Sequence, residues 1–328
     1  MIYNNAYASF INNGAFDNII TIFTPTYNRG NLIHRTYDCL KKQTIRKFVW
    51  IIVNDGSTDN TDDFVKRFVD ENSIPILYVS KRNGGKHSAF EVAFKETHTE
   101  YVMCLDDDDI YSSEAIETFL NEWDIIKAEG KYDKIGAIRT ITQEEDGRIV
   151  SKKMFDRNLL GSRLDQTTLE SNYLKHEGYE NWTCYRTAAL RETDLFSKTY
   201  WMQEQHKFFD EAIWQGRFAR KFLCRYLFVV LREYRHDTKT SIIRSSKSRQ
   251  HYVDMFINTK MILDEQLDFL KRNPKSLIKS VAIVSILRHK LHISLSDLLH
   301  HTNSTLLKVL YVLMIPLGYI SRTPKIKD

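Results

Sequence analysis

Short apolar runs alternate with amphipathic segments along the first part of the chain. Apolar runs bounded by polar residues are typical of buried strands, whereas apolar residues three and four positions apart indicate helices. This pattern predicts strands over residues 19–24, 48–53, 76–79 and 101–105. It predicts helices over residues 29–43, 61–69, 87–95 and 112–128. Strands that alternate with helices form βαβ units, so we expect an α/β fold with a mostly parallel sheet.

The pattern is less regular in the second half. Extended segments are predicted over residues 136–142, 148–150, 181–186 and 222–232. A helix is predicted over 210–220, and from about residue 253 the pattern is helical, with breaks near Pro274 and Asn303. We therefore expect an α/β domain over residues 1–235 and a C-terminal helical region over residues 236–328.

Polar residues follow each of the four strands predicted in the first half. The four polar segments are Thr26–Arg29, Asn54–Ser57, Lys81–Lys86 and Asp106–Asp109. Ligands of open α/β sheets bind at the carboxyl ends of the strands. We therefore expect these four loops to meet at one edge of the sheet and to form one site.

Four consecutive aspartates, Asp106 to Asp109, form the last of these loops. An isolated acidic run is usually a solvated loop. Here the carboxylates crowd the end of a predicted core strand and repel one another, which favours a bound cation. Alternate side chains of an extended chain share a face, so Asp106 and Asp108 are predicted to bind one divalent metal ion. A metal held by one or two carboxylates suits a diphosphate-bearing substrate.

The other loops supply candidate contacts for a nucleotide. The Asp55 carboxylate can accept a hydrogen bond from a base N–H or a ribose hydroxyl, although Asp59 is better placed to cap the next helix. Tyr27 and Arg29 can flank a nucleobase, by stacking and by a charged contact. The run Asn83-Gly84-Gly85-Lys86 allows close backbone approach and supplies a cation near ribose or phosphates, or forms an ordinary turn.

The candidate general base lies in the second half. Glu211 follows Asp210 at the predicted start of a helix and is surrounded in sequence by apolar and aromatic residues. Such an environment can tune a carboxylate for proton abstraction. Both acids would also complement the dipole at a helix N-terminus. Glu204 is a weaker candidate for the same role.

Charge is distributed unevenly along the chain. Residues 217–328 carry 21 basic and 8 acidic side chains, whereas residues 1–216 carry 26 and 34. A basic region favours an anionic partner, and the absence of a recognisable nucleic-acid module argues for lipid. The segment 306–320 is mostly apolar, shorter than the roughly 20 residues that span a bilayer, and followed by basic residues, so we expect an in-plane membrane anchor. A core helix or a subunit interface is the alternative. Four cysteines without paired spacing favour the cytoplasm.

The motifs at three of these loops are similar to those of a known family. Residues Thr24–Arg29, Asn54–Thr61 and Leu105–Asp109 resemble, in order and spacing, the signatures of family 2 glycosyltransferases, which have the GT-A fold. The stretches Asn83–Ala89 and Phe209–Trp214 resemble a bacterial subgroup that builds surface polysaccharides.

The resemblance implies an inverting transferase that uses magnesium or manganese and a nucleotide-sugar donor, usually a UDP-sugar. It implies a donor half over residues 18–125 and an acceptor half over 126–235, with a glycan or lipid-linked acceptor. Asp55 would contact uracil or ribose, Asp106 would face the ribose and Asp108 would bind the metal. Glu211 or Asp210 would be the base, in the reverse order of the family's usual Glu-Asp pair. The residues predicted to bind the nucleotide sugar are Pro25, Tyr27, Arg29, Asp55, Asn83, Gly85, Lys86, Asp106 and Asp107.

This interpretation places the protein on the inner face of the cell membrane. Two other functions use the same features. A sugar nucleotidyltransferase would consume a nucleoside triphosphate and release pyrophosphate, and a non-catalytic protein would only bind the nucleotide sugar.

Overall fold

The computed structural model describes residues 1–151, 155–175, 180–195, 209–235 and 248–320. The chain divides into two compact units. The first comprises Met1–Thr167, Glu177–Thr193 and Lys221–Thr238, and the second comprises Thr168–His176, Asp194–Arg220 and Lys239–Asp328. The second unit thus combines the C-terminal helices with two earlier segments of the chain. The expected boundary between an α/β domain and a helical region at residue 235 stays a prediction.

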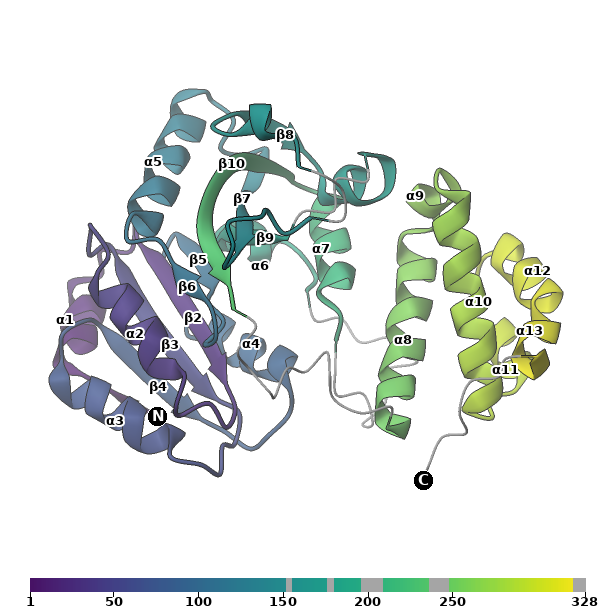
Figure 1. The fold of residues 1–328 in the computed structure, drawn as a ribbon, viewed down its shortest axis with the longest axis horizontal. Coiled ribbons are helices and arrows are strands. Elements are labelled where there is room, and N and C mark those ends of the chain that lie inside the picture. Colours follow the sequence, from purple (N-terminus) through teal and green to yellow (C-terminus); the bar gives the residue numbers. More distant parts are fainter. Residues whose placement is uncertain (152–154, 176–179, 196–208, 236–247, 321–328) are drawn as a thin grey trace. The chain divides into compact units, whose positions relative to one another are not determined.

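The first unit is built on one ten-stranded sheet with the order β1-β4-β3-β2-β5-β9-β7-β10-β6, in which β8 also pairs with β10 (Figure 1). The four central strands β4, β3, β2 and β5 are parallel, as predicted. Antiparallel pairing begins where β9 joins β5. The strands are β1 (Ile2–Tyr3), β2 (Ile20–Thr26), β3 (Phe48–Asn54), β4 (Ile76–Ser80), β5 (Tyr101–Cys104), β6 (Ile110–Tyr111), β7 (Ile135–Glu144), β8 (Arg163–Gln166), β9 (Asn181–Arg186) and β10 (Leu223–Tyr234).

Six α-helices belong to the first unit as described. They are α1 (Asn5–Asn13), α2 (Ile33–Lys41), α3 (Thr61–Glu71), α4 (Lys86–Lys95), α5 (Ala115–Ala128) and α6 (Thr187–Arg191). The four predicted helices are confirmed, but α2 begins four residues later than residue 29. Its expected first turn is instead a loop: Asn28 has a φ of +53°. A Cβ on Gly30 would lie 2.9 Å from the Thr61 nitrogen, so this loop packs directly against the start of α3.

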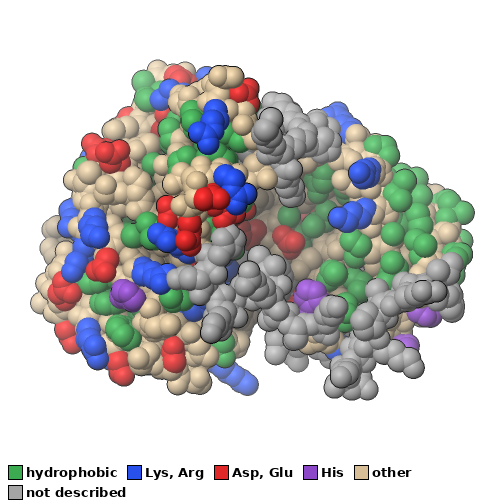
Figure 2. Space-filling model, in the orientation of Figure 1, with side chains coloured by type: hydrophobic (Ala, Val, Ile, Leu, Met, Phe, Trp, Pro, Cys, Tyr) green, Lys and Arg blue, Asp and Glu red, His purple; other side chains and the backbone are tan. Residues whose placement is uncertain are grey.

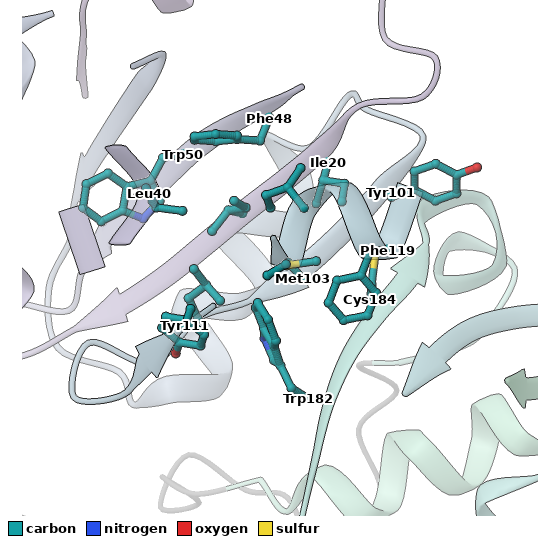
Figure 3. Close-up of a cluster of buried hydrophobic side chains, with 14 of the residues drawn as sticks. Ile20, Leu40, Phe48, Trp50, Tyr101, Met103, Tyr111, Phe119, Trp182 and Cys184 are labelled. Atoms are coloured by element: carbon teal, nitrogen blue, oxygen red, sulfur yellow. The ribbon is translucent and has the colours of Figure 1, made fainter. Parts of the chain in front are cut away.

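The core explains why the central strands are almost continuously apolar. On one face of the sheet, side chains such as Trp50, Met103 and Trp182 pack together (Figure 3). On the other face, Phe23 packs edge-to-face on Phe90 of α4, with ring centroids 5.1 Å apart. Strands covered on both faces bury every side chain, which fixes their register. The carboxyl ends of β2 to β5 therefore stand on a rigid frame.

A buried ion network joins α5 to the outer strands. Arg225 of β10, 1% exposed, donates to Glu122 at 2.8 Å and to Glu129 at 2.6 Å, and it also pairs with Asp165 of β8. Burial opposes ionisation of Asp165, but the neighbouring Arg225 and Lys131 outweigh it and lower its pKa. The network thus fixes charged groups between a helix and two strands.

Replacing Arg225 with Met is expected to destabilise the fold by about 3 kcal/mol, because it removes the buried cation shared by three carboxylates and leaves Glu122 paired with Arg163. Urea denaturation measures the change. Arg148→Met is the matched control, since Arg148 forms an exposed pair with Asp146 and its loss should leave the midpoint unchanged. Equal midpoints for the two variants would contradict a structural role for the network.

The second unit is helical in its described residues. Its helices are η2 (Glu170–Lys175, a π-helix), α7 (Glu211–Ala219), α8 (Arg249–Glu265), α9 (Leu267–Lys271), α10 (Pro274–Lys290), α11 (Leu295–His300), α12 (Thr305–Leu313) and α13 (Ile315–Ile320). The predicted break near Pro274 is confirmed: Asn273 caps α10 and Pro274 occupies its first turn. Gln266 donates to Ala212 and accepts from Tyr173, which ties α7 and η2 to the end of α8.

Candidate active site

The loops that follow β2, β3 and β5 are joined by hydrogen bonds. The Asp55 amide donates to the Thr26 carbonyl at 2.9 Å, and the Asn28 amide donates to Ser57 Oγ at 2.9 Å. Thr26 Oγ1 donates to Asp107 Oδ2 at 2.8 Å. The predicted convergence of these loops at one edge of the sheet is therefore present in the fold.

Exposure alternates along the acidic run. The side chains of Asp106 and Asp108 are 34% and 24% exposed, whereas Asp107 and Asp109 are 6% and 1% exposed. The backbone is not extended here as predicted, because Asp107 and Asp108 form a turn, but the carboxylates of Asp106 and Asp108 still lie on the accessible side. The two acids predicted to share a metal are the two that a ligand can reach.

Each accessible carboxylate is paired with a cation from another loop. Lys86 Nζ lies 2.8 Å from Asp106 Oδ1, and Arg29 Nη1 lies 3.1 Å from Asp108 Oδ2. Burial opposes ionisation of Asp106, but Lys86, Arg232 and Arg29 outweigh it and hold its pKa below the ordinary value. Two carboxylates and two cations therefore lie together where the four loops meet.

The two buried acids of the run, Asp107 and Asp109, have raised pKa values. Burial raises the pKa of Asp107 to about 7, against the lowering effects of Arg29 and of the hydrogen bond from Thr26. Burial likewise raises the pKa of Asp109 to about 7, against the lowering effect of Arg232, whose Nε lies 3.3 Å from it. Asp107, predicted to bind the nucleotide sugar, thus holds the end of β2, and Asp109 holds β10.

Asp55 is enclosed by the loop between β4 and α4. Its Oδ1 accepts from Lys81 Nζ at 2.6 Å and from the Gly84 amide at 2.9 Å, and its Oδ2 accepts from the Gly85 amide at 2.7 Å. Asn83 donates its side-chain amide to the Asp55 carbonyl at 2.9 Å. Asp55, Asn83 and Gly85, which were predicted to surround the base and ribose, are therefore joined by hydrogen bonds.

Asp59, rather than Asp55, contacts the start of the next helix, although the N-cap residue itself is Asn60. Asp59 accepts from the Thr61 amide at 3.0 Å and from the Gly30 amide at 3.1 Å, at the start of α3. The Asp55 carboxylate instead accepts its hydrogen bonds from the loop after β4. Gly56, which follows it, has a φ of +81°, and a Cβ there would meet the Asn83 nitrogen at 2.9 Å, so only glycine fits this turn.

The remaining predicted contacts lie at the end of β2. Tyr27 is 48% exposed, so its ring is accessible for stacking. Pro25 is half-buried in β2, and its register partner is Val53 of β3. Arg29, which was predicted to contact a nucleobase, forms an ion pair with Asp108.

The donor set fits a divalent ion that also binds a diphosphate. Among the described residues no cluster of three or more His, Cys, Asp or Glu side chains could hold a metal. Within the acidic run 106–109, the accessible carboxylates are those of Asp106 and Asp108, and such a pair suits an ion that takes its other oxygens from phosphate and water.

The candidate bases lie in the second unit. Asp210 caps α7: its carboxylate accepts from the Ala212 amide at 2.9 Å, and its own amide donates to Asn258 at 3.2 Å. Glu211 is the first residue of α7, and its side chain is exposed. Asp210 is thus the N-cap of α7, and Glu211 as the catalytic base stays a prediction. Glu204 lies outside the described residues.

Two cations near the site were not singled out from the sequence. Lys81 stands in a loop from which the sequence singled out only Asn83, the two glycines and Lys86. Arg232 ends a run predicted simply as a strand, and nothing in that run signals that it pairs with Asp109 and, at 3.0 Å, with Glu180.

Comparison with known proteins identifies the family of the chain. The Glycosyl transferase family 2 model matches residues 21–198, more than half of the chain. Chondroitin synthase of Pasteurella multocida is 35% identical over 105 residues, which are 32% of this chain and 11% of that protein. Glycosyltransferase GlyA of Streptococcus pneumoniae is 32% identical over 102 residues, 31% of this chain and 14% of that protein. The chain thus matches only a small part of these relatives' length.

Solved structures show the same fold over most of the chain. TarS of S. aureus, residues 1–349, superposes with a TM-score of 0.57 at 16% identity, covering 92% of this chain and 89% of that one. Its complex with UDP-GlcNAc gives a TM-score of 0.55 at 16% identity, with coverage of 90% and 79%. The chain therefore has a GT-A fold and belongs to glycosyltransferase family 2.

Proposed function

We propose that this protein transfers a sugar, with inversion, from a nucleotide-diphosphate sugar to a hydroxyl group of a glycan or lipid-linked acceptor in surface polysaccharide biosynthesis. The observation that carries the proposal is the alternation at the end of β5, where Asp106 and Asp108 remain accessible among three other polar loops. A UDP-sugar is the donor we favour, because the TarS structure that shares this fold was solved with UDP-GlcNAc.

Asp106 and Asp108 would hold magnesium or manganese, and the ion would supply charge stabilisation for the departing diphosphate. Lys86 and Arg29 then stand beside the same anionic group and add positive charge to it. The loop after β4 holds Asp55, which accepts a hydrogen bond from the base. These residues bind and orient the donor.

Glu211 takes the proton of the acceptor hydroxyl in this proposal. The acceptor oxygen then forms a bond to the anomeric carbon from the side opposite the diphosphate, while the bond from that carbon to the diphosphate oxygen breaks. The electron pair leaves with the nucleoside diphosphate, and the configuration of the sugar inverts. Asp210 supports this step by capping the helix that carries Glu211.

A screen of UDP-, GDP- and dTDP-sugars tests the donor class. A ligand that binds only the folded protein raises its stability by about 2.7 kcal/mol at 100 times its dissociation constant. We expect a UDP-sugar with manganese to raise the melting temperature, and EDTA to abolish the shift. Release of pyrophosphate from a nucleoside triphosphate and a sugar phosphate would instead indicate a nucleotidyltransferase, and donor binding without turnover across many acceptors would indicate a binding protein.

The second unit carries the features of the expected membrane contact. Among the described helices, none has the length and apolar character needed to cross a bilayer. The apolar segment predicted as an anchor forms α12 and α13, and α12 buries Leu307 and Tyr311. Four of its other apolar side chains are exposed, between 39% and 67%: Leu306, Val309, Val312 and Leu313.

Hydrophobic side chains gather over α12 and the neighbouring α10 (Figure 2). On α10, Ile278 is 50% exposed between the exposed Lys275 and Lys279. Apolar side chains beside lysines match the boundary between acyl chains and anionic headgroups. We therefore assign the predicted anionic membrane contact, on the inner face of the membrane, to this surface.

The double variant Val309→Asp/Leu313→Asp is expected to weaken binding to phosphatidylglycerol vesicles at least about tenfold, because it removes two exposed apolar side chains and adds negative charge. Vesicle co-sedimentation measures the effect. Ile125→Asp, at an exposed apolar position on α5 of the first unit, is the control. Unchanged binding of the double variant, or no binding by the unaltered protein, would exclude this surface as the contact.

A further inference from the structure

The acceptor capacity of Asp55 is almost fully used within the protein. A carboxylate has about four lone-pair sites, two on each oxygen. Oδ1 receives both Lys81 Nζ, at 2.6 Å, and the Gly84 amide, at 2.9 Å, whereas Oδ2 receives only the Gly85 amide, at 2.7 Å. One acceptor site therefore remains, and it is on Oδ2.

Lys81 is fixed in the position that fills Oδ1. Besides Asp55, its ammonium donates to the Arg82 carbonyl at 2.7 Å and to Ser88 Oγ at 2.8 Å. An ammonium has three N–H donors, so each has an acceptor. Ser88 in turn donates to the Gly85 carbonyl at 2.8 Å, which closes the loop around the lysine.

We propose that Lys81 determines the nucleobase specificity of the donor site, an inference that rests on the proposed contact between Asp55 and the base. Uracil and thymine present one ring N–H between two carbonyl groups, which matches a single free acceptor. Guanine presents two adjacent donors, N1–H and the exocyclic amine, which require both carboxylate oxygens. With Oδ1 occupied, one guanine donor loses its partner, and a site with fixed polar groups discriminates strongly against such a mismatch.

Lys81→Met tests this inference, because it removes the ammonium and frees one of the two acceptor sites on Oδ1, the other staying with the Gly84 amide, while it retains the apolar stem of the side chain. Binding of UDP and GDP is measured by calorimetry in the presence of manganese. We expect the unaltered protein to prefer UDP by about 100-fold or more, and Lys81→Met to narrow that preference at least about tenfold. Lys81→Arg, which keeps a charged donor at Oδ1, is expected to retain the preference. Lys95→Met, at an exposed position near the end of α4, is the control.

Asp55→Ala separates this inference from the function on which it rests. If Asp55→Ala binds UDP as tightly as the unaltered protein, Asp55 does not contact the base and that part of the proposed function fails. If Asp55→Ala weakens UDP binding but folded Lys81→Met keeps the full preference for UDP, only the role of Lys81 is overturned. Should Lys81→Met fail to fold, Ser88→Ala removes one anchor of the lysine and is expected to narrow the preference in the same direction. An unchanged preference in Ser88→Ala would then overturn the role of Lys81.

Discussion

Replacing Asp108 with Asn is expected to lower sugar transfer at least about 1000-fold. The substitution removes one of the two accessible carboxylates at the end of β5, which are the proposed seat of the metal. Loss of several kcal/mol of charge stabilisation in the transition state corresponds to this factor, at about 1.4 kcal/mol for each tenfold change in rate. Initial rates with saturating UDP-sugar and manganese measure it.

Asp124→Asn is the matched control for this variant. Asp124 is an exposed aspartate of α5, and its replacement should leave both turnover and melting temperature unchanged. The Asp108→Asn variant should also keep its fold, because asparagine has the same size as aspartate and Arg29 keeps its charge interactions with Asp106 and Asp107. A near-normal rate in a folded Asp108→Asn enzyme would show that the metal does not bind at Asp108.

Replacing Glu211 with Gln is expected to lower turnover at least about 100-fold, because the amide cannot accept the proton of the acceptor hydroxyl. Donor binding should be unchanged, since the proposed donor contacts lie in the loops after β2 to β5. Steady-state rates with the acceptor, together with calorimetry of UDP binding, separate the two effects. The expected signature is a fall in kcat with an unchanged dissociation constant for UDP.

Asp210→Asn is the companion variant. Asparagine caps a helix about as well as aspartate, so α7 should keep its N-terminal hydrogen bond. If Asp210 is only the cap, this variant retains turnover within about threefold of the unaltered enzyme. The opposite result, a normal Glu211→Gln enzyme and an inactive Asp210→Asn enzyme, would move the base to Asp210.

The parallel part of the fold could be predicted because each of its strands is buried on both faces. Such strands are continuous apolar runs, and β3, predicted over residues 48–53, ends only one residue later. The outer strands gave weaker signals. Residues 148–150, predicted as a strand, contribute only an isolated bridge between Ile149 and Gln143. β1 and β6, two residues each, are too short for a periodic pattern.

The sequence predicted the accessible pair, Asp106 and Asp108, but for the wrong backbone: the two-residue period assumed an extended chain, whereas Asp107 and Asp108 form a turn. Two cations at the site could not be predicted. Lys81 and Arg232 reach Asp55 and Asp109 through tertiary packing, and a lysine or arginine at a strand end looks the same in sequence whether or not it meets a carboxylate. Likewise, only the described geometry of α7 separates Asp210, a cap, from its exposed neighbour Glu211.

A crystal structure of the protein with UDP and manganese tests the central claim most directly. The account predicts an anomalous manganese peak within bonding distance of Asp108, shared with the diphosphate, and a uracil ring bonded to Asp55. A nucleotide bound elsewhere, or a diphosphate at the end of β5 with no metal between it and these carboxylates, would contradict the account.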